Sequence, residues 1–516
     1  PTKNLGLGLG KRRLLFPYSR SPSPSRPIAM ATGVAQEPEE EETAMDTEVA
    51  QEPEEETAMD TGAVPDPEEG TVVILDSVML DRIGRTHCHN GLGAARKAVK
   101  GNKTAVQVDM DSGRSFYVSF TLAAPPQGGA SYLDLHLPES SAKSVPPFAQ
   151  PAYPYVRAID KDLVLFHVSI PSQTRHCAFT THLFVYTAAG HSPSVQQLPL
   201  YHDDRRIMPF LGDKSTTGIL RRQEGRYIVA DLNLYGKENA TGNYYMCAEL
   251  CIFNSNSRSR MWRLSIQDAP KPQDQSNGQF PTLWSTDHVL ALDGRFMCWV
   301  DYFSGVLLSD FCNMRLSRVL HFVPFPGEEE YTAEVREERC FAQRFRSVSI
   351  SQGKMRFVHI DNDLHTELHT GCQGQRPSQK ITIWTLNMMD ANSRFKWEPH
   401  HVIDLDRLWL TPSVPRRLPE YPIIAPNNPD VLYCLLRKQE FHGEASMIMV
   451  DMNPASPWLC TPYINRRSVH VKDHKSEFPN MPLLPTVFFK YLESSTGLFI
   501  VPMIATHMLP VPGWLY

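Results

Sequence analysis

Short runs of hydrophobic residues alternate with turn-forming residues along most of this chain. From about residue 71 the runs are rich in β-branched and aromatic residues and are bounded by Gly, Pro, Asn and Asp, which is typical of β-strands. The clearest runs are "TVVILDSVML" (71–80), "TAVQVDM" (104–110), "SFYVSFTLAAPP" (115–126), "LVLFHVSI" (163–170), "THLFVYTA" (181–188), "RYIVADLNL" (226–234) and "YYMCAELCIF" (244–253). One short helix is predicted near 91–99, and no long amphipathic helix is apparent. The pattern predicts an all-β sandwich, barrel or propeller.

A weak internal repeat narrows the prediction to a β-propeller-like fold. Three stretches run glycine, basic residue, strand and aspartate: "GRYIVAD" from Gly225, "GRFMCWVD" from Gly294 and "GKMRFVHID" from Gly353, with "GEASMIMVD" from Gly443 as a looser fourth. Glycine supplies a turn before each strand and aspartate a turn after it. Hairpin units with variable loops are typical of propeller blades. Trp262, Trp299 and Trp384 end or interrupt such strands, where their rings are expected to pack between sheets.

The first 70 residues are predicted to be a disordered tail, and residues 71–516 a β-rich body. Residues 1–29 are rich in Arg, Ser and Pro, as organellar transit peptides are, but Met30 is the more convincing translation start. An acidic segment is then duplicated as "VAQEPEEEETAMDT" (34–47) and "VAQEPEEETAMDT" (49–61). Its few apolar residues cannot offset the chain entropy lost on folding. Thr43 and Thr57 each precede an aspartate by three residues, which makes phosphorylation of this tail a hypothesis.

Composition excludes several classes of protein. Residues 1–30 carry six Lys/Arg, and residues 37–69 carry fifteen Asp/Glu; removing them from totals of 51 and 57 leaves 45 basic and 42 acidic residues. A nearly neutral body gives nucleic-acid binding little electrostatic support. The ten cysteines form no CxxC pair, as expected of reduced thiols in a cytosolic or nuclear protein. The apolar C-terminal stretch 497–516 is broken by prolines, so we expect no membrane span.

Each candidate catalytic motif fails on physical grounds. "HTELH" (365–369) places Glu367 two residues after His365, whereas the zinc-protease motif H-E-x-x-H needs the glutamate directly after the first histidine. "GHSPS" (190–194) puts Pro193 where a nucleophile elbow needs a backbone N–H. "HCH" (87–89) and the pair Cys247/Cys251 need the fold to bring other ligands to them, and are more simply surface imidazoles and buried thiols. We assign no catalytic, cofactor-binding or metal-binding residue and expect no cofactor.

The stretch "MCWVDYFSGVLLSDF" (297–311) contains two aspartates nine positions apart. Asp301 and Gly305 are turn-forming residues at the two ends of "YFS". In a hairpin, Asp310 would lie at the far end of the returning strand, whereas paired catalytic carboxylates lie roughly 5–10 Å apart. We therefore predict a structural hairpin, with Trp299 packed into a β core.

The same stretch carries a family resemblance. "WVDYFSGVLLSDF" (299–311) resembles the W-x-D-x-x-x-G-[IV]-L-x-x-D core of the domain of unknown function 1618 family, which is abundant in grasses. "VILDSVML" (73–80) and "YVSFTLAAPP" (117–126) resemble its N-terminal part. "GKMRFVHID" (353–361), "ITIWTL" (381–386), "FKWEPHHVIDLDRLWL" (395–410) and "YPIIAPNNPDVLYCLL" (421–436) resemble its C-terminal part. The family core motif is placed at about 297–436. A looser likeness links the chain to the propeller-like domains attached to F-box proteins, although no F-box precedes the body.

The resemblance implies a β-rich, propeller-like fold and no established activity. The leading functional hypothesis is a non-enzymatic scaffold that binds a protein partner through its loops. One alternative is a hydrolase or metal-dependent enzyme whose site is assembled in space, for instance from His87, His89, His365 and His369. A second is an adaptor for ubiquitin ligases. We expect a monomer in the cytoplasm or nucleus with an unknown protein partner, no nucleic-acid partner and no membrane association.

Overall fold

The computed structural model describes most of the chain from residue 76 onward. The described residues are 76–126, 129–138, 154–171, 179–200, 216–238, 244–267, 271–272, 280–281, 283–312, 319–327, 342–361, 379–388, 395–410, 414–437, 445–452, 459–463 and 483–492. The predicted disordered tail with Thr43 and Thr57 lies outside them, as do His365 and His369. Those predictions stay untested.

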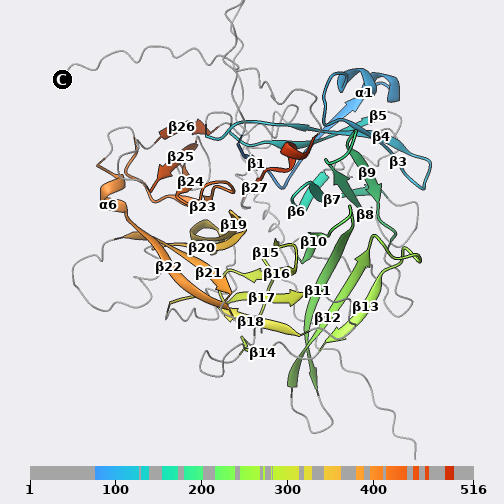
Figure 1. Cartoon of the computed structure of the whole chain (residues 1–516). Helices are drawn as coiled ribbons and strands as arrows, with labels where there is room; N and C mark the ends of the chain where they lie inside the picture. The colour runs from blue at the N-terminus through green and yellow to red at the C-terminus, as the bar shows by residue number, and fades with distance from the viewer. Residues whose placement is uncertain are drawn as a thin grey trace, which may run out of the picture. The chain divides into compact units, whose positions relative to one another are not determined.

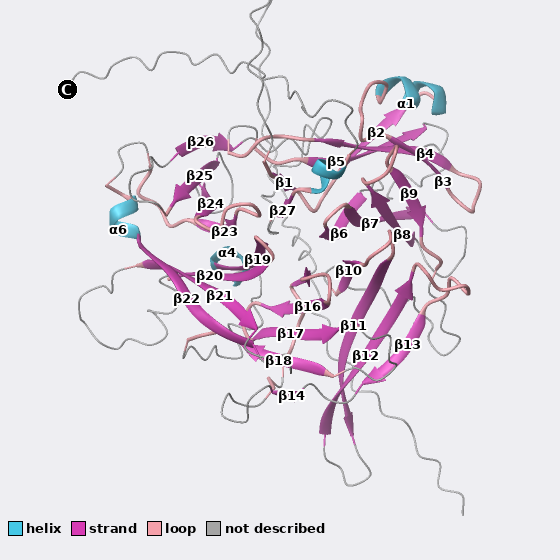
Figure 2. Ribbon diagram, in the orientation of Figure 1, coloured by secondary structure: helices cyan, strands magenta, loops and turns pink. Residues whose placement is uncertain are grey.

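Six sheets of the described residues, five with four strands and one with five, are arranged as the blades of a β-propeller (Figures 1 and 2). Blade 1 holds β2 (Arg85–His89), β3 (Val106–Asp109), β4 (Ser115–Thr121) and β5 (Tyr132–Pro138). Blade 2 holds β6 (Pro154–Asp160), β7 (Leu163–Pro171), β8 (Phe179–Thr187) and β9 (Ser194–Gln197). Blade 3 holds β10 (Thr217–Arg221), β11 (Tyr227–Glu238), β12 (Tyr244–Asn254) and β13 (Arg263–Gln267). Blade 4 holds β15 (His288–Leu292), β16 (Phe296–Asp301), β17 (Gly305–Asp310) and β18 (Leu320–Pro324), with β14 (Lys271–Pro272) beside β18. Blade 5 holds β19 (Arg346–Ser351), β20 (Lys354–Ile360), β21 (Lys380–Met388) and β22 (Phe395–Asp404). Blade 6 holds β23 (Glu420–Ile424), β24 (Val431–Arg437), β25 (Ala445–Asp451) and β26 (Leu459–Tyr463). The prediction of an all-β, propeller-like body is confirmed.

Helices are few and short in the described part of the chain. They are α1 (Leu92–Ala98), α4 (Ala342–Phe345), α6 (Leu405–Leu408) and the 3₁₀ helix η3 (Phe488–Tyr491). The helix predicted near 91–99 is α1. None of the helices in the described ranges has the length and apolar character that crossing a lipid bilayer requires.

Both ends of the described chain meet in one small sheet. β1 (Val78–Leu80) pairs antiparallel with β27 (Leu484–Thr486), and β1 also bonds to the start of β5 through Ser131. The three residues of β1 are fully buried. Blades 2–6 follow chain order as antiparallel meanders, whereas in blade 1 the strand β2 runs parallel to β5. The β1–β27 pair therefore closes the ring by joining the two ends of the described chain.

The hydrophobic core of the described residues consists of seven clusters, of which six lie between two neighbouring blades and a small seventh lies under α1 in blade 1. The cluster between blades 1 and 2 also takes in Phe488 of η3, and the cluster between blades 6 and 1 takes in Met79 of β1. The remaining clusters between blades join blades 2 and 3, 3 and 4, 4 and 5, and 5 and 6. Trp262, Trp299 and Trp384 each pack between two blades, as predicted. A ring of blade-to-blade contacts buries both faces of every sheet without a single central core.

The predicted repeat corresponds to the second strand of three successive blades. In blades 3, 4 and 5 the turn before that strand has positive φ at both central residues, as in type I′ hairpins. These pairs are Glu224–Gly225 (56° and 75°), Asp293–Gly294 (55° and 58°) and Gln352–Gly353 (48° and 75°). The looser fourth member differs, because "ASMIMVD" forms β25, the third strand of blade 6.

The segment 297–311 is a hairpin, as predicted. Asp301 pairs with Gly305 at the turn, and Asp310 pairs with Phe296 at the opposite end of the two strands. Five residue steps along β16 separate these ends by roughly 17 Å, too far for a shared acid–base role. The Asp301 carboxylate is fully buried and accepts backbone N–H bonds from Ser285 (3.1 Å) and Phe303 (2.9 Å), so it stabilises the turn.

Trp299 and Gly305 fix this hairpin between its neighbours. The Trp299 side chain is fully buried, and its Nε1 donates a 2.8 Å hydrogen bond to the Thr216 carbonyl oxygen of the preceding blade. Gly305 has φ +153°, and a Cβ there would lie 2.4 Å from the Val323 carbonyl oxygen. Packing and backbone geometry thus explain why tryptophan and glycine occupy these two positions.

The cysteines match the prediction of free thiols. All seven cysteines within the described ranges are free, and Cys247, Cys251, Cys298 and Cys434 are buried. Burial raises the pKa of the Cys298 and Cys434 thiols far above the ordinary value, so both stay protonated and unreactive.

Candidate functional site

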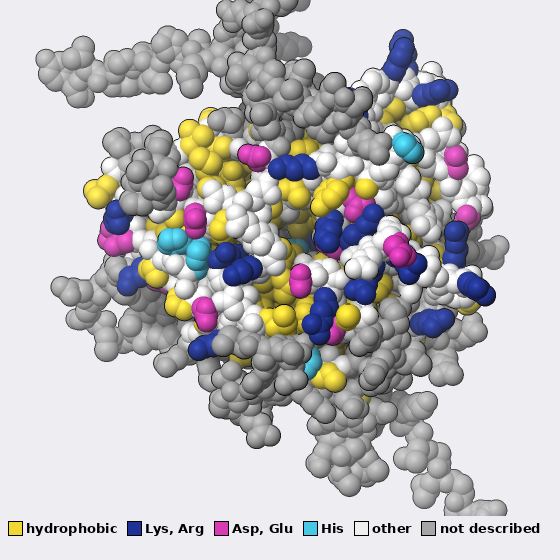
Figure 3. Space-filling model, in the orientation of Figure 1, with side chains coloured by type: hydrophobic (Ala, Val, Ile, Leu, Met, Phe, Trp, Pro, Cys, Tyr) yellow, Lys and Arg dark blue, Asp and Glu magenta, His cyan; other side chains and the backbone are white. Residues whose placement is uncertain are grey.

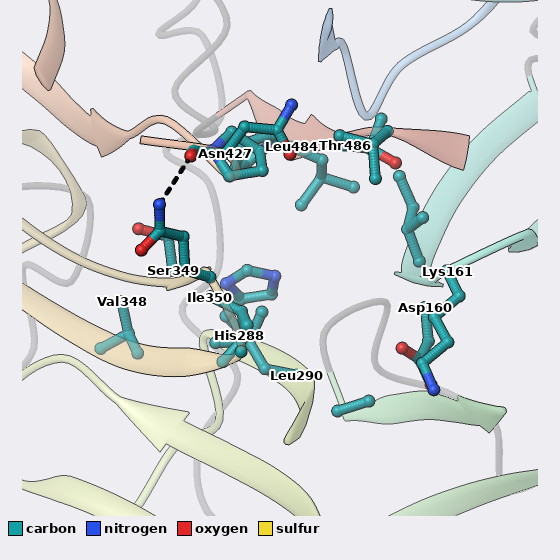
Figure 4. A pocket seen from close by; sticks show the side chains of 17 residues that line it. Asp160, Lys161, His288, Leu290, Val348, Ser349, Ile350, Asn427, Leu484 and Thr486 are labelled. Carbon is teal, nitrogen blue, oxygen red and sulfur yellow. Dashed lines mark hydrogen bonds between the residues drawn. The ribbon is translucent and has the colours of Figure 1, made fainter. Parts of the chain in front are cut away.

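A cavity of about 300 Å³ opens at the centre of the propeller, on the face that carries the turns between first and second strands. Its walls come from β6, β15 and β19, from the β6–β7, β19–β20 and β23–β24 turns, and from β27. We call it the central pocket (Figure 4). The first strands of several blades contact one another around this centre, which is why residues far apart in the sequence line one space. A central pocket of this size is the usual position and scale of a ligand site.

Apolar and polar side chains share the lining of the central pocket in similar proportion. Apolar walls are contributed by Ile159, Leu290, Val348, Ile350 and Leu484, and polar groups by Asp160, Lys161, His288, Ser349 and Asn427. Figure 3 shows the same mixture on this face, where hydrophobic side chains lie between groups of Lys/Arg and Asp/Glu side chains. The combination allows apolar contact for affinity and polar contact for orientation.

His288 and Ser349 are, with Thr486, the most deeply buried polar residues in the pocket wall. His288 is 5% exposed and Ser349 3% exposed, and Figure 4 shows the His288 ring projecting into the pocket. His288 Nδ1 and Ser349 Oγ have no hydrogen-bond partner within the described part of the chain. An unpaired buried polar atom costs about 1–3 kcal/mol, so a bound group that pairs with either atom recovers that energy.

The charged groups of the pocket differ in their protonation. Burial lowers the pKa of His288 well below its usual value, and the nearby Arg82 guanidinium adds to the effect, so this imidazole stays neutral. Burial raises the pKa of Asp160 to about 6, although the Arg221 backbone N–H donates to its Oδ2 at 2.6 Å. Lys161, next to Asp160 in the β6–β7 turn, is exposed at the pocket rim.

His87 and His89, both named as candidate ligands, lie instead in a polar network on blade 1. His87 Nε2 lies 2.9 Å from Asp134 Oδ1, and His89 Nε2 lies 3.1 Å from Nδ1 of His136. Ser119 Oγ lies 3.0 Å from His136 Nε2. No sequence pattern links Asp134, His136 and Ser119 to the "HCH" motif, because β2 pairs with β5, and β5 with β4, only in the folded sheet.

The network is satisfied by its own members and does not activate a nucleophile. Burial alone would raise the pKa of Asp134, but hydrogen bonds from His87 and Arg85 outweigh it and hold the pKa at about 2. Burial and the charge of His87 lower the pKa of His136 to about 4. Ser119 is only 3% exposed, and its histidine partner is a weak base, so this arrangement is poorly suited to nucleophilic catalysis.

Replacing His136 with glutamine is expected to reduce the acid sensitivity of the fold. Because the pKa of His136 is about 4 when folded and 6.5 when unfolded, the unfolded chain binds the proton first as the pH falls. The neutral imidazole therefore stabilises the fold fully above pH 6.5, and this contribution is lost between pH 6.5 and 4. Urea midpoints at about pH 7.5 and about pH 5 measure the difference. Equal losses for wild type and variant would contradict the assignment.

Cys247 and Cys251 lie on β12 and are buried, as the simpler interpretation of the sequence predicted. Among the described residues, the group of His, Cys, Asp or Glu side chains close enough to share a metal ion is His400, His401 and Asp430. Sequence reasoning missed this group. The two adjacent histidines directly after Pro399 could have indicated this group, because a proline within a strand marks a sheet edge or a bulge.

One family model matches part of the chain. A family described as "Protein of unknown function (DUF1618)" matches residues 299–433, which confirms the resemblance carried by the core motif. No curated protein matches the chain. Among solved structures, xylan β-1,4-xylosidase from Bacillus halodurans C-125 is 10% identical, with a TM-score of 0.25 and 73% of this chain and 70% of that chain covered. A mannose phosphorylase from Leishmania mexicana, solved with a phosphate ion, is 10% identical, with a TM-score of 0.18 and coverage of 74% and 86%.

Proposed function

We propose that this chain, with its DUF1618 segment, is a non-enzymatic binding module that receives a protein partner on the face around the central pocket. The observation that supports this most is the pocket itself, whose apolar walls surround buried polar atoms without partners. A segment of a partner that inserts an apolar side chain with a hydrogen-bonding group would match both features.

The chemistry of the pocket favours binding over catalysis. Ser349 Oγ and His288 Nδ1 make no hydrogen bond, so these two groups are not arranged as a nucleophile and its base. The lowered pKa of His288 also makes it a poor proton acceptor. Asp160 titrates near pH 6 and lies at the mouth with Lys161, where a charge pair orients a partner better than it performs acid–base chemistry.

The proposal also covers the cellular compartment, the oligomeric state and the class of partner. Free, buried thiols fit a reducing compartment, so we place the chain in the cytoplasm or nucleus. We also propose that it acts as a monomer without a nucleic-acid partner, since the body is nearly neutral.

Reversing the charge of Lys161 tests the proposal. Affinity purification of the full chain from its native cells, followed by quantitative mass spectrometry, is expected to recover a partner with wild type. Recovery should fall by roughly fivefold with Lys161→Glu, the effect of about 1 kcal/mol. The matched control is Lys97→Glu, the same change on an exposed residue of α1 in blade 1.

Equal recovery with both variants would place binding elsewhere and refute the proposal. If ubiquitin-ligase subunits were among the proteins that co-purify with wild type but not with Lys161→Glu, the partner would be a ubiquitin ligase. Hydrolytic activity that survives purification and is abolished by a pocket substitution would favour the enzyme alternative instead.

A further inference from the structure

Three side chains with metal-binding atoms meet between blades 5 and 6. His400 and His401 lie on β22, the outer strand of blade 5, and Asp430 lies in the β23–β24 turn of blade 6. The Nε2 atoms of both histidines point at the same carboxylate oxygen, Asp430 Oδ1, at 3.2 and 3.5 Å. All three ligand atoms lie within 4.8 Å of one another. In Figure 3, histidine side chains lie at the surface beside Lys/Arg and Asp/Glu side chains at the left of the face shown.

A β-bulge is what brings the two histidines together. Successive residues of a regular strand point to opposite faces of the sheet, so adjacent histidines would normally diverge. Here His401 pairs with Ile383 and Pro399 pairs with Trp384, which leaves His400 as the extra residue of the bulge. Bulges re-aim side chains and are found at sheet edges and functional sites. The bulge in blade 5 therefore lies at the position where it turns both histidines toward the same point.

Asp430 is held in place by its backbone, independently of the histidines. Its backbone N–H donates to Asn428 Oδ1 at 3.0 Å, and its carbonyl oxygen accepts a 2.8 Å bond from the Met452 N–H. The turn that carries Asp430 is thus fixed within blade 6. A ligand fixed by its own backbone loses little entropy on binding an ion.

The spacing fits a tetrahedral transition-metal ion. Zinc bonds to imidazole nitrogen and carboxylate oxygen are about 2.0–2.1 Å long, which places neighbouring ligand atoms of a tetrahedron about 3.3 Å apart. The two nitrogen–oxygen separations of 3.2 and 3.5 Å bracket that value. The 3.5 Å separation is also long for a hydrogen bond. Two imidazoles with one carboxylate suit Zn²⁺, and an oxygen-only set would be needed to favour Mg²⁺ or Ca²⁺.

Access and charge set the expected behaviour of this group. The three side chains are 27%, 40% and 49% exposed, so an ion can enter and keep one position open to solvent. Arg356 is close enough to interact electrostatically with His400 and Asp430, and its positive charge opposes binding of a cation.

We propose that His400, His401 and Asp430 form a Zn²⁺ site that links blade 5 to blade 6. The site uses none of the residues of the central pocket, so it can exist whether or not the pocket binds a partner. Its ion would bridge the outer strand of one blade and an inner turn of the next, and so stabilise the ring.

Zinc titration of the full, metal-stripped chain tests the site. Isothermal calorimetry with ZnCl₂ is expected to show one more bound equivalent for wild type than for Asp430→Asn or His401→Gln. Cobalt(II) in place of zinc should give the visible absorption of a tetrahedral site in wild type, and both variants should lose it. The matched control is His89→Gln, which removes a half-exposed histidine from the blade 1 network and should leave binding unchanged.

Zinc should also raise the melting midpoint of wild type and of His89→Gln, but not of the two ligand variants. Circular dichroism of the metal-free variants distinguishes loss of the site from loss of the fold. The proposal is overturned if wild type and the ligand variants bind equal amounts of zinc, or if His89→Gln removes the bound equivalent.

Discussion

Replacing Trp299 with alanine is expected to lower the free energy of unfolding by about 3–5 kcal/mol. The indole is fully buried in the cluster between blades 3 and 4, so its removal leaves a cavity that two separate sheets must close. The Thr216 carbonyl oxygen also loses its hydrogen bond from Nε1. A protein of ordinary stability has only about 5–15 kcal/mol to lose. Urea unfolding followed by far-ultraviolet circular dichroism measures the change.

Two control variants separate the contribution of indole packing from that of the hydrogen bond and from the effect of any substitution in the propeller. Trp299→Phe keeps an aromatic ring and removes the donor, so about 1–2 kcal/mol is expected. Val402→Ala changes a residue of β22 that is 59% exposed and should stay within about 0.5 kcal/mol of wild type. A Trp299→Ala variant within about 1 kcal/mol of wild type would show that blades 3 and 4 do not pack through this ring.

Ending the chain at residue 482 is expected to abolish cooperative unfolding of the propeller. The deletion removes β27, the partner of β1, and takes Phe488 from the cluster between blades 1 and 2. Phe488 is fully buried, with its ring centroid 4.6 Å from that of Phe120 and 6.1 Å from that of Tyr186. Without these contacts the buried strand β1 becomes a free edge, and exposed strand edges promote aggregation.

A point variant tests the same contact without removing a segment. Phe488→Ala should retain the fold but lose about 3–5 kcal/mol. Tyr491→Ala, in the same 3₁₀ helix but 40% exposed, should change stability by less than about 1 kcal/mol. If the shortened chain melted cooperatively at the wild-type midpoint, β27 would have no part in closing the ring.

Local features of this fold could be predicted because they depend on neighbours in sequence. The type I′ turns at Gly225, Gly294 and Gly353 require positive φ, which favours glycine, so glycine recurs in the sequence before each of the three strands. The hairpin at Asp301 and Gly305 was predictable for the same reason, since turn residues and two apolar runs lie within fifteen residues. Packing of Trp299 between sheets followed from its place in a buried strand.

Features that depend on distant pairing could not be predicted. β1 and β27 lie some four hundred residues apart, and no local pattern indicates that they pair. The central pocket likewise combines β6 with β15, β19 and β27, so its residues share no motif. At His400 the decisive fact is the register between β21 and β22, because a single bulge changes which face an imidazole occupies. Alternation along the strand alone would have separated the two histidines.

The proposed partner binds over the central pocket. Site-specific photo-crosslinking tests this binding most directly, with a photoreactive residue at Gln352 in the exposed β19–β20 turn of the pocket lining and, as control, at Lys97 on α1. In native cells, we expect a crosslinked partner protein at position 352 and none at position 97. A partner crosslinked equally at both positions, or only at position 97, would contradict it.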